Sequence, residues 1–93
     1  FAQDTTLPEG FVYQILLFPS PRHATLDEIK GLDPVYERLT NALRYTYSVG
    51  VFRTFDEALQ QLNPIRQLGF PEAEIIAFLD GKPIAVSLAR RSE

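Results

Sequence analysis

Apolar residues recur along the chain at several different spacings, and each spacing predicts a different element. Residues 11–18 are apolar almost without interruption, rich in aromatic and β-branched side chains, and bounded by Gly10 and Pro19. This composition predicts a strand in the middle of a sheet. Residues 43–49 instead alternate between apolar and polar side chains, which is typical of a strand with one buried face. Gly50 is expected to end that strand.

A helix is predicted over residues 55–68, where apolar side chains recur at helical spacing. Thr54 and Glu57 have the spacing of a capping box, in which each side chain bonds the backbone N–H of the other residue. The glycine and apolar residue at 69–70 are typical of a helix end. Pro64 interrupts the helix, but the apolar positions stay in phase across it, so we expect one kinked helix rather than two. The predicted buried face consists of Phe55, Ala58, Leu59, Leu62 and Ile65.

Residues 25–31 carry similar signals over a shorter span. Thr25 and Glu28 repeat the capping-box spacing and a glycine closes the segment, which predicts a helix of about six to eight residues. Residues 35–40 then alternate imperfectly and predict a strand. A turn at Asn41-Ala42 would lead from this strand into the next one.

The last third of the chain predicts a hairpin. Residues 73–79 are expected to form a strand, and Asp80-Gly81 favours a two-residue type I′ turn after it. The partner strand is expected over residues 82–88. Pro83 would confine that strand to the edge of the sheet, because proline has no N–H to donate to a neighbour.

Together these elements predict an α+β fold of the ferredoxin-like type, with the order βαββαβ. The sheet would be antiparallel, with two helices on one face and an extra C-terminal edge strand. The other face would be open to solvent or to a ligand. We expect residues 1–10 to be a linker or disordered arm, residues 11–89 to be the domain, and residues 90–93 to be a solvated tail.

Composition excludes several classes of function. The chain has 93 residues and no cysteine, so it contains one domain and neither a thiolate nucleophile nor a cysteine zinc site. Its single histidine, His23, cannot build a multi-histidine metal site. The net charge of −3 and the pI of about 5.1 argue against nucleic-acid binding, which depends on clustered Lys and Arg. No apolar run approaches the roughly 18 residues of a membrane span, and no cofactor is expected.

Two segments resemble the sporulation-related repeat (SPOR) domain family. Residues 13–18 are similar to the first-strand pattern of that family, which reads apolar, Gln, apolar, Gly, small, Phe. Residues 47–52, followed by Glu57-Ala58, resemble its V-x-V-G-P-F…E-A signature. Two positions depart from these patterns, since Leu16 stands where the family usually has glycine and Val51 where proline is common.

The resemblance extends over residues 11–88, most of the chain. Residues 69–70 and the strand after them fit the family, and residues 73–82 look like the variant common in Bacteroidetes-type envelope proteins. The resemblance implies a non-catalytic domain that binds peptidoglycan, particularly glycan strands stripped of their peptide stems. It also implies a location in the periplasm or cell envelope, often at division sites, with no membrane contact from the domain itself.

Strand alternation selects the candidate ligand-binding residues. If the helices cover the face of Tyr13 and Ile15, then Gln14 points to the open face, where its amide could bond sugar hydroxyls or simply pair with a neighbour or water. The same argument places polar side chains of residues 43–49 outward, and in the next strand an exposed Phe78 that could stack on a sugar or instead belong to the core. The candidate set is Gln14, Arg44, Thr46, Ser48 and Phe78.

For the tyrosines and the paired acidic residues, a structural role is favoured over a functional one. Tyr13, Tyr36, Tyr45 and Tyr47 could form an aromatic platform, but their spacing favours packing. The acid pairs at 27–28 and 56–57 could suggest glycoside hydrolysis, which needs two carboxylates across a bond. Both pairs lie in predicted first turns, where negative charge complements the helix dipole.

These observations leave several functions to compare. A non-catalytic module that binds peptidoglycan glycan strands is our first hypothesis, and a protein-interaction or self-association domain, such as a homodimer, is the alternative. An RNA-recognition module shares the order of elements but needs basic and aromatic residues clustered on its third strand. Arg44 with the outward Thr46 and Ser48 fits that requirement poorly, and the acidic pI makes the fit poorer. An enzyme is the least favoured, because no nucleophile or acid–base pair converges.

Overall fold

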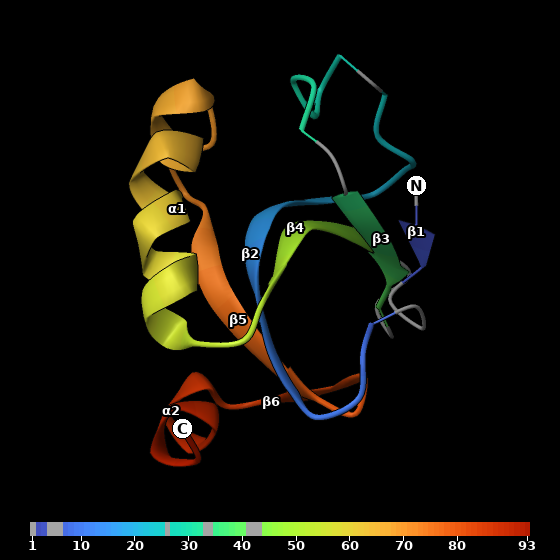
Figure 1. Cartoon of the computed structure of the whole chain (residues 1–93). Coiled ribbons are helices and arrows are strands. Elements are labelled where there is room, and N and C mark those ends of the chain that lie inside the picture. The colour runs from blue at the N-terminus through green and yellow to red at the C-terminus, as the bar shows by residue number, and fades with distance from the viewer. Residues whose placement is uncertain (1, 4–6, 26, 33–34, 41–43) are drawn as a thin grey trace.

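Two helices and a curled sheet make up the described part of the chain in the computed structural model (Figure 1). The structure describes residues 2–3, 7–25, 27–32, 35–40 and 44–93. The elements in order are β1 (Ala2–Gln3), β2 (Phe11–Ser20), β3 (Val35–Leu39), β4 (Tyr45–Phe52), α1 (Phe55–Leu68), β5 (Glu74–Leu79), β6 (Lys82–Ile84) and α2 (Val86–Arg91). The turn predicted at Asn41-Ala42 and the strand start predicted at Leu43 lie outside the described residues.

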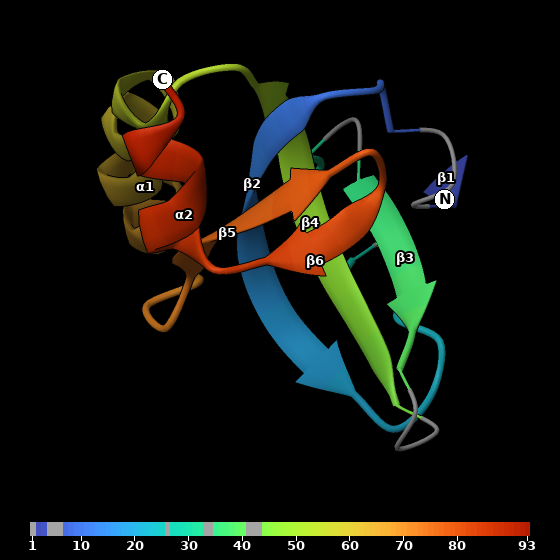
Figure 2. The same ribbon diagram turned by 90° about the horizontal axis from the view of Figure 1, so that it is seen from below.

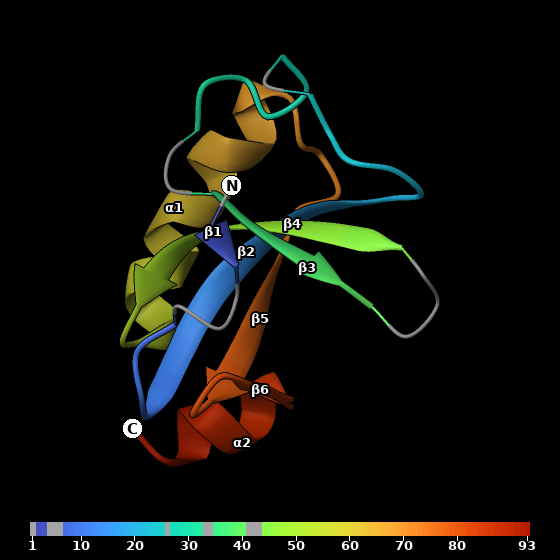
Figure 3. The same ribbon diagram turned by 90° about the vertical axis from the view of Figure 1, so that its right-hand side faces the viewer.

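The six strands form a single sheet in the order β1-β3-β4-β2-β5-β6. Neighbouring strands from β3 to β6 are antiparallel, and β1 adds to the edge of β3 in parallel (Figure 3). Two residues of the predicted arm therefore belong to the sheet. The α+β class and the antiparallel sheet are confirmed, and β2 lies between β4 and β5, as its continuous apolarity predicts.

Two bulges bend the central strand pair. Tyr13 pairs with Phe52 and Ile15 with Val49, so two residues of β4, Gly50 and Val51, oppose the single residue of β2 between them. Gly50 has a φ of +85°, a conformation that suits glycine at the first position of such a bulge. A second irregularity follows between Leu16 and Phe18 of β2. The prediction that Gly50 ends the strand is wrong, since the bulge carries β4 on to Phe52.

Both helices pack on the same face of the sheet (Figure 2). In the larger core cluster, Ile15, Tyr47 and Val49 of the sheet meet Leu62 and Ile65 of α1. A smaller cluster joins the two helices to the sheet through four residues, Tyr13, Ala58, Ala77 and Ala89. The helices therefore cover the face that bears Tyr13, Ile15 and Leu17, as predicted. The opposite face of the curled sheet is concave.

Helix α1 has the predicted ends. The Thr54 side chain accepts the backbone N–H of Glu57 at 3.2 Å, and Glu57 accepts the backbone N–H of Thr54 at 3.1 Å, which completes the capping box. The helix passes through Pro64 as one element and ends at Gly69, after which Phe70 packs into the core. Leu59, predicted to be buried, is 47% exposed, whereas Ala58, Leu62 and Ile65 of the predicted face are buried and Phe55 packs edge-to-face against Tyr13.

The helix predicted over residues 25–31 is replaced, in its described part, by consecutive turns. Thr25 and Glu28 do exchange hydrogen bonds at capping-box spacing, at 3.0 and 3.3 Å. The backbone bonds that follow, from Lys30 to Asp27 and from Leu32 to Ile29, join residues three apart. Lys30 has a positive φ of 55°, and so short a segment gains too few helical bonds to offset nucleation.

The hairpin prediction is confirmed at its turn and wrong at its end. Asp80 and Gly81 have φ values of 51° and 80°, as a type I′ turn requires. β6 forms the sheet edge and contains Pro83, but it stops at Ile84 instead of reaching Leu88. The alanine, leucine and arginine residues that follow favour a helix, and they form α2 once Ala89 is buried.

The predicted tail at 90–93 is part of the packed structure. The Arg90 guanidinium lies 4.0 Å from the ring centre of Phe55, and Glu93 accepts the backbone N–H of Phe55 at 2.9 Å. The Tyr13 hydroxyl also donates to Glu93, and burial together with this bond raises the pKa of Tyr13 to about 12. These contacts fasten α2 to the start of α1. No helix in the described ranges is both long enough and apolar enough to cross a membrane.

Replacing Gly50 tests the bulge. A Cβ at this position would collide with the Phe52 ring and would force alanine into a positive φ. We expect Gly50→Ala to lower the free energy of unfolding by about 2–3 kcal/mol. Gly81→Ala is the control, because φ there is +80° but nothing lies within 4 Å of the added Cβ, so only about 1 kcal/mol should be lost. Equal losses in urea unfolding would show that the bulge tolerates a side chain.

Candidate functional site

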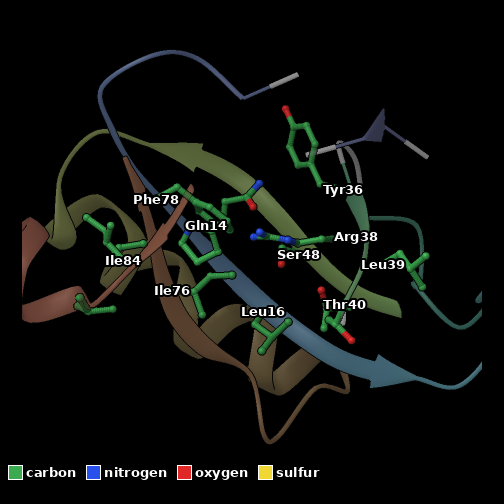
Figure 4. Close-up of a pocket in the computed structure, with 14 residues that line it drawn as sticks. Gln14, Leu16, Tyr36, Arg38, Leu39, Thr40, Ser48, Ile76, Phe78 and Ile84 are labelled. Carbon is green, nitrogen blue, oxygen red and sulfur yellow. The ribbon is translucent and has the colours of Figure 1, made fainter. Parts of the chain in front are cut away.

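The concave face of the sheet, opposite the helices, contains a hollow of about 430 Å³ (Figure 4). Its volume is in the range of small-ligand sites. The residues that line it come from β2, β3 and the residue after it, β4, β5, β6 and the start of α2. They are Gln14, Leu16, Tyr36, Arg38, Leu39, Thr40, Thr46, Ser48, Ile76, Ala77, Phe78, Pro83, Ile84 and Val86.

Four of the five residues predicted as ligand-binding line this hollow. Gln14 of β2, Thr46 and Ser48 of β4, and Phe78 of β5 all face it. Arg44 does not line it, although strand parity predicted that it would accompany Thr46 and Ser48. It precedes β4 and is exposed, so it lies beyond the end of the paired region.

Gln14 lies at the floor of the hollow and is only 1% exposed. Its Nε2 donates to the backbone carbonyl of Gly50 at 2.9 Å. Gln14 is also the residue opposite the Gly50 bulge, where the regular bonds of the ladder are interrupted. One role of the side chain is therefore structural, since it donates a hydrogen bond to a backbone carbonyl of the bulge.

Phe78 is on the predicted face but is not exposed. Only 3% of it is accessible, because the Arg38 guanidinium lies 5.3 Å from its ring centre and Pro83 of β6 pairs beside it. Ser48 is likewise buried, at 5% exposure. Gln14, Ser48 and Phe78 thus form the base of the hollow, and Thr46 belongs with other partly buried residues to its accessible rim.

Strand β3 supplies most of the rim, although none of its residues was among the predicted ligand-binding residues. Tyr36 pairs with Ser48 and Arg38 with Thr46, so their side chains point to the same side of the sheet. The alternation of Tyr36, Arg38 and Thr40 was a usable signal. Its counterpart on the opposite face is imperfect, because the charged Glu37 lies between the apolar Val35 and Leu39.

Glu37 is in fact buried on the opposite face, within a hydrogen-bonded network. The Tyr47 hydroxyl donates to its Oε2 at 2.7 Å and accepts the Ala24 backbone N–H at 2.6 Å. The His23 Nδ1 lies 2.8 Å from the same oxygen of Glu37. Burial alone would raise the pKa of Glu37, but the bonds from His23 and Tyr47 outweigh it and hold the pKa below its usual range. Burial and the bond to Glu37 raise the pKa of Tyr47 to about 12.

The lining combines hydrogen-bonding and apolar side chains. It offers an amide, hydroxyls and one guanidinium beside apolar side chains, and none of the lining residues carries a carboxylate, thiol or imidazole. Elsewhere in the part of the chain that the structure describes, no three histidine or acidic residues gather closely enough to hold a metal ion.

Comparisons of the chain with protein-family models, with curated proteins and with solved structures each returned no significant match.

Substitution of Gln14 tests its role at the bulge. Gln14→Leu keeps the size of the side chain but leaves the Gly50 carbonyl without this donor, which should cost about 1–3 kcal/mol in the free energy of unfolding. Gln67→Leu, on the exposed side of α1, is the matched control and should change stability by less than about 0.5 kcal/mol. Similar urea midpoints for both variants would contradict a structural role for Gln14.

The Glu37 network should make stability dependent on pH. Because the folded-state pKa of Glu37 is held below its usual value of 4.5, ionised Glu37 stabilises the fold above that pH, and this contribution is lost as the pH falls through the folded-state pKa. Glu37→Gln should lose about 1 kcal/mol at pH 7 and approach the parent protein in acid. Urea unfolding at a series of pH values measures this. The exposed substitution Glu72→Gln should leave the difference between neutral and acid stability unchanged.

Proposed function

We propose that this chain is a divergent SPOR-like domain and that its concave sheet face binds glycan strands of bacterial peptidoglycan without catalysing a reaction. The observation that carries the proposal is the composition of the hollow. Hydrogen-bonding side chains and apolar side chains face each other across one solvent-accessible space, and a glycan needs both. The proposed setting is the periplasm or cell envelope.

Sugars present two kinds of surface, and the hollow has partners for each. Hydroxyl and acetamido groups at the edge of a sugar ring need donors and acceptors, which Tyr36, Thr40 and Thr46 supply around the rim. The C–H faces of the ring need apolar or aromatic contact, which Ile76 and Ile84 supply. Both kinds of residue are only partly buried, so a ligand could reach them.

The strand order supports a ferredoxin-like arrangement. The four strands β3-β4-β2-β5 are adjacent in that order, as expected when a strand–helix–strand unit is interleaved with a second one. Helix α1 provides the second crossover. The first crossover contains the turns at 27–31 instead of a helix, and β1, β6 and α2 are additions. The chain is thus compatible with the fold, with departures at its first connection.

Self-association through the same face is the second candidate. Leu39, at the rim of the hollow, is 54% exposed, and an exposed leucine beside an apolar hollow is suited to a protein contact. Light scattering distinguishes the two functions, because a dimer that closes the hollow would compete with glycan.

Retention on peptidoglycan sacculi tests the glycan proposal. The protein should sediment with sacculi, and more strongly after an amidase has removed the peptide stems. Tyr36→Ala should reduce retention about five- to tenfold, the effect of losing one aromatic contact. Arg44→Gln should leave it unchanged, because Arg44 lies outside the hollow. If neither preparation of sacculi retains the parent protein, the glycan proposal is wrong.

A further inference from the structure

A second hollow, of about 420 Å³, lies on the helix side of the sheet, away from the concave face. Its walls come from the end of β2, the turns at 27–31 and the loop between α1 and β5. Figure 1 shows the turns and this end of α1 together at the top of the view. None of the described residues that line this second hollow also lines the concave one, and its volume is again in the range of small-ligand sites.

Apolar side chains form the floor of the second hollow. The rings of Phe18 and Phe70 stack almost in parallel, with an interplanar angle of 6° and ring centres 6.0 Å apart. Phe70 and Leu17 are buried, whereas Phe18 is only partly buried and Pro71 is exposed. An apolar group of a ligand can therefore rest on Phe18 and Pro71, and an aromatic group would add a favourable ring contact.

Two side chains of opposite charge line the second hollow without pairing. Lys30 and Glu72 form no ion pair with each other, and neither side chain has another ion-pair or hydrogen-bond partner in the part of the chain that the structure describes. The carboxylate of Glu28 also lines the hollow, but Arg22 contacts it at 3.1 Å and the Thr25 backbone N–H donates to it at 3.0 Å. Lys30 and Glu72 are thus the charges that a ligand can meet.

The Lys30 side chain is held in place before any ligand arrives. It lies along Gly69, the residue that ends α1, where an added Cβ would collide with it. Its ammonium lies 5.9 Å from the ring centre of Phe70. Attraction to the C-terminal end of a helix and to an aromatic ring favours this position for a cation.

We propose that the second hollow binds a zwitterion with an apolar side chain, as found in free amino acids and short peptides. The ligand carboxylate would contact Lys30, its ammonium would contact Glu72, and its side chain would lie on Phe18 and Pro71. Two separate charges of opposite sign match a ligand that carries both, whereas a purely anionic or cationic ligand leaves one of them unpaired. The proposal does not depend on glycan binding at the concave face.

Three ligands that share one aromatic group and differ in charge test the proposal. At about pH 6, phenylalanine is a zwitterion, its amide carries only the ammonium, and 3-phenylpropanoate carries only the carboxylate. Each can be titrated into the labelled protein by two-dimensional NMR, with the signals around residues 69–72 as the report. The parent protein should bind phenylalanine about three- to fivefold more tightly than either analogue, the effect of one solvent-accessible charged contact.

Two variants assign the contacts. Lys30→Gln should remove the advantage of phenylalanine over its amide and keep its advantage over 3-phenylpropanoate, and Glu72→Gln should do the reverse. Lys82→Gln removes the charge of the other lysine of the chain, on the edge strand β6, and should change neither ratio. Glu72 is exposed, so Glu72→Gln keeps the test decisive even if Lys30→Gln destabilises the end of α1.

Further outcomes are equally informative. If the parent protein binds either analogue as tightly as phenylalanine, one of the two charges is not used and the proposal is overturned. Absence of saturable shifts around residues 69–72 would also overturn it, and Lys30 would then serve only the end of α1. Alanyl-phenylalanine, whose charges are further apart, separates the two sources of ligand. Tighter binding than phenylalanine would assign the second hollow to short peptides, and binding no tighter would assign it to free amino acids.

Discussion

The hydrogen bond from Gln14 to the carbonyl of Gly50 is the contact on which the shape of the sheet depends. At a bulge one strand has one more residue than its partner, so the regular pattern of backbone hydrogen bonds is interrupted there. Here Gln14, the residue opposite the bulge, donates a hydrogen bond from its side-chain amide to the Gly50 carbonyl, and that amide is buried on the concave face. The bulge bends the central strand pair, the bend contributes to the curl of the sheet, and the curl brings β3 and β5 close enough for Arg38 to rest against Phe78.

The two faces of the sheet handle polar residues differently. On the helix side, Glu37 and Tyr47 are buried together and their bonding capacity is directed inward, to His23 and to the Ala24 backbone. This network attaches the segment that contains the turns at 27–31 to the sheet, in place of a helix that would pack there. On the concave side, hydroxyls and the Arg38 guanidinium line the hollow. The polar residues on the helix side thus stabilise the fold, whereas several of those on the concave side remain accessible to solvent.

Sequence patterns correctly predicted the features that depend only on residues close together in the chain. The capping box of Thr54 and Glu57, the type I′ turn at Asp80-Gly81 and the central position of residues 11–18 each depend on a few adjacent side chains, and each is present. Strand parity placed Gln14, Thr46, Ser48 and Phe78 on the face that carries the hollow, and they line it. Features that depend on distant partners were missed, as with α2, which is too short to be stable without its contacts to Tyr13 and Phe55. The contribution of β3 to the site was missed for the same reason, because the inward direction of Glu37 depends on Tyr47.

Strand β6 has a consequence for how copies of the molecule can meet. An open sheet has two edges, and molecules whose edges are both free can add to one another without limit. At this edge Lys82 brings a charge, Pro83 removes a donor, and the chain turns into α2 directly afterwards. Lateral growth is therefore blocked on one side, and any pairing through the opposite edge, formed by the short β1 and by β3, would stop at two molecules instead of continuing into a fibre.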